Sequence, residues 1–146
     1  MLGPCLGPTD NLLVVLRRQL EPPLRANREL GLSLPVPPRS TTIPDLVILD
    51  AARVRPEANE QPPAIVHVVV EIASPATYRK DRTVKSDKCA QAGIPGYWRV
   101  ELDPIRVIAY ALREDTYAEL GAWTAGETVE VDEPVRVRFD PGALLP

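Results

Sequence analysis

The spacing of hydrophobic residues predicts a helix near the start of the chain. Leucines recur at helical intervals between residues 12 and 20. Thr9 or Asp10 is the expected N-cap, because a short polar side chain can accept a hydrogen bond from the first turn. The Pro22-Pro23 pair is expected to end this helix.

The longest apolar run predicts a strand and is followed by a second helix. The run is AIVHVVVEIAS, residues 64–74, and the Ser74-Pro75 step is expected to end it. A helix is expected from about residue 81 to residue 92. Gly93 would provide its C-terminal cap, and Pro95 lies just beyond.

Shorter apolar runs between turn residues predict the remaining strands. They cover 29–36, 44–50, 97–103, 106–112, a weaker pair at 116–122 and 128–131, and a last strand through 135–139. A polar loop is expected over about 53–63. This order of elements indicates an α/β (α+β) fold, with a central mixed β-sheet flanked by helices and extra antiparallel strands at the C-terminus.

Composition predicts one soluble domain spanning residues 1–146. Hydrophobic residues make up 45% of the 146 and charged residues 25%, a balance that argues against global disorder. No apolar run approaches the roughly 20 residues of a membrane helix, and the start has no secretory pattern. Cys5 and Cys89 are therefore expected to be free thiols in a reducing cytoplasm.

Charge is distributed unevenly along the chain. The net charge of −3 and the pI near 5.2 lower the odds of a nucleic-acid partner. The segment from Tyr78 to Lys88 differs, because five basic residues against two acidic ones leave it at +3, so the rest of the chain carries −6. Its basic residues are Arg79, Lys80, Arg82, Lys85 and Lys88. Such a run is most often a solvated face.

An ionisable Glu71 lies near the end of the most hydrophobic strand. Burying a carboxylate costs several kcal/mol unless a partner compensates. If the strand after Pro44 is its neighbour, Asp45 can approach Glu71, and two close carboxylates favour a cation between them. Mg²⁺ suits such a site because it prefers oxygen ligands.

Structural interpretations of the same residues remain open. Glu71 could pair with an arginine, and Asp45 could be a turn residue after Pro44. Lys85 could make a solvated i,i+4 ion pair with Asp81.

The single histidine does not add a metal ligand. Strand alternation places His67, Val69 and Glu71 on one face, with Val66, Val68, Val70 and Ile72 on the other. His67 would then lie about 13 Å from Glu71, too far to share an ion. A zinc site rich in histidine is excluded, and no Gly-x-Ser-x-Gly elbow suggests a serine hydrolase.

Four segments together resemble a known family. They are PDLVILD (44–50), VVVEIASPAT (68–77), DRTVK (81–85) and AGIPGYWRVELD (92–103), in this order. Combined, they are similar to the Uma family of restriction endonucleases, within the PD-(D/E)XK nuclease superfamily. The resemblance covers roughly residues 9–144. It implies a restriction-endonuclease-like core, with a four-stranded mixed sheet between helices, and metal-dependent hydrolysis of DNA phosphodiester bonds.

The resemblance also implies roles for individual residues. Asp45 and Glu71 match the acids that would bind Mg²⁺, or Mn²⁺ in its place, with help from the carbonyl of Ile72. The superfamily usually has a lysine where this chain has Ala73, whereas Uma-like proteins have one in the following helix, which matches Lys85. Lys85 would stabilise charge in the transition state. The nearest candidates to contact the DNA backbone are Arg79, Lys80, Arg82 and Lys88.

The chain also departs from the family pattern. Uma-like proteins usually begin earlier, with a strand region that contains a glutamate, so this chain is expected to be short at its N-terminus. Cys89 occupies a position that is commonly tyrosine. The alternative is a nuclease fold that does not cut and serves as a binding or dimerisation module. In that case an exposed sheet edge could pair with a second copy to form a homodimer.

Overall fold

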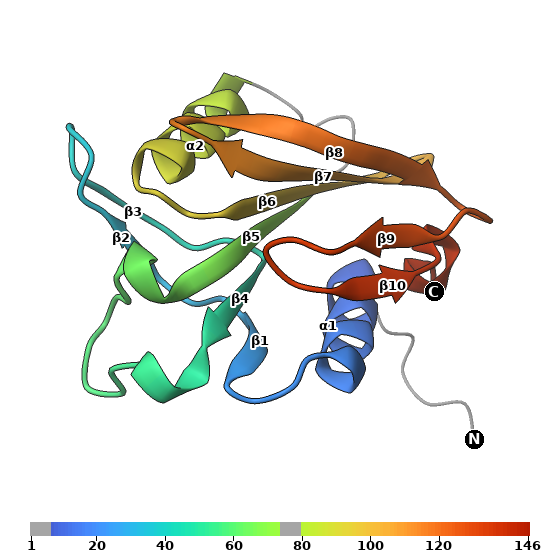
Figure 1. Cartoon of the computed structure of the whole chain (residues 1–146), viewed down its shortest axis with the longest axis horizontal. Helices are drawn as coiled ribbons and strands as arrows, with labels where there is room; N and C mark the ends of the chain where they lie inside the picture. The colour runs from blue at the N-terminus through green and yellow to red at the C-terminus, as the bar shows by residue number, and fades with distance from the viewer. Residues whose placement is uncertain (1–6, 74–79) are drawn as a thin grey trace.

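A six-stranded sheet with a helix on each face organises the chain. The computed structural model describes residues 7–73 and 80–146, which form α1 (Pro8–Gln19), α2 (Lys80–Gln91) and ten strands (Figure 1). The central sheet has the order β1-β4-β5-β6-β7-β8. Its strands are β1 (Leu24–Arg28), β4 (Leu46–Asp50), β5 (Val66–Ala73), β6 (Gly96–Leu102), β7 (Ile105–Arg113) and β8 (Thr116–Thr124).

The central sheet is mixed, as predicted. β5 and β6 run parallel, and α2 connects them, while every other neighbouring pair is antiparallel. Two shorter antiparallel pairs accompany it: β2 (Leu32–Leu34) with β3 (Ser40–Thr42), and β9 (Val129–Val131) with β10 (Val137–Phe139). The sheet is therefore wider than the four strands that the family resemblance implied.

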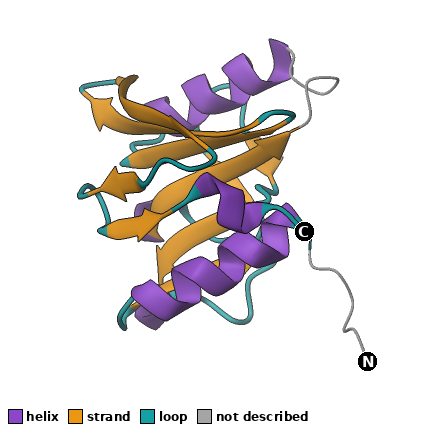
Figure 2. Cartoon of the chain, turned by 90° about the vertical axis from the view of Figure 1, so that its right-hand side faces the viewer, coloured by secondary structure: helices purple, strands orange, loops and turns teal. Residues whose placement is uncertain are grey.

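The two helices cover opposite faces of this sheet (Figure 2). Leu12 and Leu16 of α1 are fully buried in a core that includes Val70 and Trp98. Cys89 of α2 is buried in a second core against the other face of the sheet. Each helix has 12 residues, and no helix among the described residues is long and apolar enough to cross a membrane.

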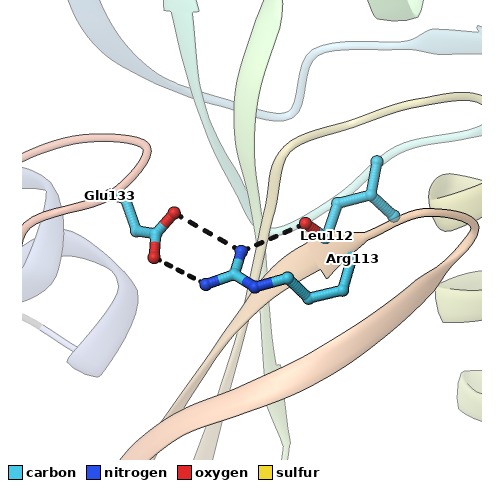
Figure 3. Close-up of polar contacts among 3 residues, drawn as sticks. All are labelled: Leu112, Arg113 and Glu133. Carbon is cyan, nitrogen blue, oxygen red and sulfur yellow. Dashed lines mark hydrogen bonds and ion pairs between the residues drawn. The ribbon is translucent and has the colours of Figure 1, made fainter.

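The C-terminal strand pair extends the core on the α1 face. Val129, Val131, Val137 and Phe139 are buried with the residues of α1. Figure 3 shows how the loop before β10 is tied to β7: Arg113 Nη2 lies 2.7 Å from Glu133 Oε1, and Arg113 Nη1 donates to the carbonyl of Leu112 at 3.2 Å. The carboxylate of Glu133 raises the pKa of Arg113.

The helix ends agree with the sequence prediction at one cap and differ at another. α1 begins at Pro8 with Gly7 as N-cap, so Thr9 and Asp10 lie in its first turn instead of capping it. Proline favours this position because its missing N–H would be unpaired there anyway. The C-terminal cap of α2 is as predicted: Gly93 has φ +83°, and Ile94 N donates to the carbonyl of Cys89 at 3.1 Å.

Three strand predictions were wrong in detail. The strand expected over 29–36 is shorter than predicted, because only Leu32–Leu34 form β2 and Glu29, with φ +53°, lies between β1 and β2. β1 itself was missed, since Ala26 is its one buried residue and gives almost no hydrophobic pattern. The expected pairing of 116–122 with 128–131 is also wrong, because β8 pairs with β7 and β9 pairs with β10.

An irregularity in β5 changes which residues share a face. Ile48 pairs with Val68, but Leu49 pairs with Val66, so the register shifts at this point. Val66 therefore packs in the core beneath α2 together with Val69, and not with Val68 as simple alternation predicted. Beyond the shift, side chains alternate regularly between the two faces, so Glu71 lies on the same face as Val69, the face that α2 covers.

Candidate functional site

Asp45 and Glu71 come together across two neighbouring antiparallel strands. Leu46 pairs with Val70, and the same register continued by one residue places Asp45 opposite Glu71. Asp45 Oδ2 accepts a hydrogen bond of 2.7 Å from the backbone N–H of Ile72. This bond fixes the Asp45 carboxylate beside the end of β5, where the sequence placed the second acid.

Glu71 lies in a largely buried environment, with 7% of its surface exposed. Its neighbours on the same face include Val47, Val69 and Tyr97, which belong to the core beneath α2. A carboxylate in such surroundings is costly unless polar or charged groups compensate for its lost hydration. Glu71 therefore occupies a position where its carboxylate needs polar or charged groups to compensate for burial.

Lys85 belongs to α2, the helix that covers this face of the sheet. Its side chain is exposed, and it precedes the buried Cys89 by one helical turn. Burial raises the pKa of the Cys89 thiol to about 12; the negative charge of Glu71 adds to this shift, and the positive charge of Lys85 opposes it. Both charged groups therefore act on the same buried thiol.

Of the four basic residues predicted to contact DNA, the structure describes the side chain of Lys88 alone. Arg79 lies outside the described residues, and Lys80 and Arg82 belong to α2, where their side chains are not described. Lys88 is half-buried, and its Nζ donates to the carbonyl of Pro38 at 2.8 Å and to Ser40 Oγ at 3.0 Å. Nucleic-acid binding by these four residues stays a prediction.

The donor set fits a magnesium-type ion. Among residues 7–73 and 80–146 there is no group of three or more His, Cys, Asp or Glu side chains placed to hold a metal. Mg²⁺ does not need one, because it keeps several waters and usually takes one or two carboxylates together with substrate phosphates. Asp45 and Glu71 provide two carboxylates on one face, and Asp45 presents its second oxygen, Oδ1, with no donor among the described residues.

A family model of known proteins matches residues 8–141, nearly the whole chain. The family is Uma2, described as "Putative restriction endonuclease". The chain belongs to the Uma2 family. This result confirms the resemblance that the four sequence segments indicated.

The Uma2 chain is also similar to a solved structure. It aligns with the crystal structure of "a putative nuclease belonging to DUF820" from Anabaena variabilis, with a TM-score of 0.68 and 18% sequence identity. The alignment covers 94% of this chain and 77% of the other. At this identity the match establishes the fold, and it confirms the predicted restriction-endonuclease-like architecture. No curated protein matches the sequence.

Sequence reasoning missed one charged residue beside the acid pair. Arg99 of β6 pairs in register with Glu71 and therefore lies on the same face of this Uma2 sheet. Its Nε lies 3.2 Å from Glu101 Oε2, and its guanidinium carbon lies 5.9 Å from the ring centre of Tyr110 on β7. Alternation in YWRVELD indicated which face Arg99 occupies, but the pairing of β6 with β5 could not be read from it.

Proposed function

We propose that this Uma2 protein is a divalent-metal-dependent endonuclease that hydrolyses phosphodiester bonds in DNA. The observation that carries the proposal is the position of Asp45, whose carboxylate the N–H of Ile72 holds next to buried Glu71. Family membership supports the same reaction class. Neither support alone assigns the activity, but both favour the same class of reaction.

Asp45 and Glu71 would hold Mg²⁺, or Mn²⁺ in its place. When bound, such a cation supplies Lewis acidity, which lowers the pKa of water and offsets phosphate charge. Asp45 is suited to this task because its hydrogen bond to Ile72 restricts one oxygen and so orients the other. Glu71 is suited because its burial keeps bulk water from competing for the carboxylate.

Lys85 would stabilise the negative charge that develops on the phosphate. Its exposed side chain starts from the helix face that also buries Cys89, and the four-carbon stem can extend toward the acids. A positive charge aimed at the developing oxyanion lowers the activation barrier because it interacts more strongly with the transition state than with the substrate. Lys85 thus takes the role that a lysine at position 73 has in other members of the superfamily.

The basic segment would bind the DNA backbone. Arg79, Lys80 and Arg82 follow Glu71 in the chain, and the last two belong to α2, which covers the face of the sheet that contains Glu71. Lys88, the fourth predicted contact, instead donates to Pro38 and Ser40. Contacts to phosphates supply affinity without sequence specificity and weaken as the salt concentration rises. This local charge would allow a protein with a net charge of −3 to bind a polyanion.

Cleavage of supercoiled plasmid in Mg²⁺, with EDTA as the blank, tests this proposal. The wild-type protein should nick or linearise the plasmid, whereas Glu71→Gln and Asp45→Asn should each lose at least about 100-fold in rate, because each removes an essential charge. Glu57→Gln is a matched control, since Glu57 is exposed and lies outside the site. Equal cleavage by the wild type and Glu71→Gln would remove Glu71 from the mechanism. Binding without cleavage would instead indicate an inactive DNA-binding module.

A further inference from the structure

The ammonium group of Lys88 joins two parts of the chain that are distant in sequence. Nζ donates to the carbonyl of Pro38 at 2.8 Å and to the hydroxyl of Ser40 at 3.0 Å, across separations of 50 and 48 residues. Both acceptors are uncharged: Pro38 lies in the loop at the tip of the β2–β3 hairpin, and Ser40 is the first residue of β3. Lys88 therefore binds the hairpin through hydrogen bonds to neutral oxygens and not through an ion pair.

Both ends of this contact lead directly to the candidate site. Ser40 opens β3, and the chain reaches Asp45 five residues later. On α2, Lys85 lies three residues before Lys88, which places the two lysines on neighbouring positions of one helix face. The contact thus connects the segment that delivers Asp45 with the helix that delivers Lys85.

The base of the hairpin is fixed independently of Lys88. Leu32 and Leu34 are buried, and Ser33 N donates to the carbonyl of Gln61 at 3.0 Å. Gln61 N in turn donates to the carbonyl of Gly31 at 2.8 Å. Loss of the Lys88 contact would therefore loosen the hairpin tip and α2 while leaving the hairpin core in place.

We propose that Lys88 is a positioning residue, which sets the distance between Asp45 and Lys85 by fastening α2 to the tip of the β2–β3 hairpin. This inference rests on the proposed nuclease function, because it assigns Lys88 a role in arranging that site. The role differs from phosphate contact, since two of the three ammonium N–H groups are already directed into the protein.

Cys89 provides a readout of α2 docking that does not depend on activity. It follows Lys88 in the helix, is 1% exposed, and has a pKa of about 12, so a thiol reagent reaches it only when α2 opens. The experiment uses the full chain with Cys5→Ser, so that Cys89 is the one remaining thiol. It compares Lys88→Met and Ser40→Ala with the parent, with Lys85→Met as the labelling control.

Three rates or affinities are measured on each protein: Cys89 modification by a disulfide reagent, single-turnover plasmid cleavage in Mg²⁺, and duplex DNA affinity in Ca²⁺. Lys88→Met should speed modification and slow cleavage, each by about tenfold, because small displacements of a catalytic group are costly. Its DNA affinity should stay within about twofold, since no phosphate contact is lost. Ser40→Ala should have a smaller effect in the same direction, and Lys85→Met should slow cleavage without speeding modification, because the charge of Lys85 favours the Cys89 thiolate.

Any of three results for Lys88→Met would overturn the inference. The first is an unchanged rate of Cys89 modification, and the second is faster modification with an unchanged rate of cleavage. The third is a large loss of DNA affinity with normal modification, which would make Lys88 a phosphate contact. If the parent protein cleaves no DNA, the proposed function fails, and with it the catalytic part of this inference; the modification rate then still decides whether Lys88 fastens α2 to the hairpin.

Discussion

The N–H of Ile72 donates a 2.7 Å hydrogen bond to Asp45 Oδ2, although 27 residues separate the two in sequence. The bond joins the residue before β4 to the strand that carries Glu71. Because Ile72 directly follows Glu71, the bond fixes the Asp45 carboxylate relative to the backbone of Glu71. A site that must present two carboxylates to one ion benefits from this rigidity.

Substitutions at Asp45 should separate the structural role of its carboxylate from its charge. Asparagine retains an oxygen that can accept from Ile72, whereas alanine leaves that N–H without its acceptor. We expect Asp45→Ala to lower the free energy of unfolding by about 1–3 kcal/mol and Asp45→Asn to lower it much less. Both should lose cleavage equally. Urea denaturation and plasmid cleavage of the same preparations measure the two effects, and equal stability of both variants would show that the hydrogen bond contributes nothing.

Removing the charge of Glu71 should abolish the stabilisation of the protein by Mg²⁺. Glu71 is buried opposite a second carboxylate, and an ion held by both acids would bind the folded state and not the unfolded one. Thermal unfolding in EDTA and in Mg²⁺ measures the effect. Addition of Mg²⁺ should raise Tm for the wild type and leave Glu71→Gln unchanged; an equal rise in Tm for both proteins would argue against Glu71 as a metal ligand.

Stability should fall at alkaline pH because of Cys89. Burial raises the pKa of its thiol from an ordinary value of 9.0 to about 12, so the folded state retains a proton that the unfolded state releases. The stabilisation is therefore complete below pH 9 and is lost as the pH rises toward 12. From pH 8 to pH 10 the free energy of unfolding should fall by about 1.4 kcal/mol more for the wild type than for Cys89→Ala. Parallel pH profiles of the two proteins would exclude this linkage.

The parts of the fold that sequence predicted correctly have strong local signals. α2 has a glycine cap followed by proline, and β5 has the longest apolar run of the sequence; both elements lie close to their predicted bounds. β1 has no such signal, since it is a short edge strand with Ala26 as its one buried residue. Its place in the sheet depends on pairing with β4, which is a long-range contact that no local pattern reports.

The candidate site could be predicted in its residues but not in its geometry. Asp45 and Glu71 were selected because acids beside apolar strands need an explanation, and the antiparallel pairing of β4 with β5 does place them opposite each other. Arg99 and Lys88 show what was beyond reach. The position of Arg99 depends on the register of β5 with β6, and the contact of Lys88 with Ser40 depends on how a hairpin folds over a helix.

Isothermal titration of the metal-free protein with Mn²⁺ tests the central claim most directly, because it requires neither a DNA substrate nor turnover. We predict one bound ion per chain for the wild type and for Glu57→Gln, and no detectable binding for Glu71→Gln or for Asp45→Asn. Absence of binding by the wild type, or equal binding by the wild type and Glu71→Gln, would contradict the assignment of these two acids as a metal site.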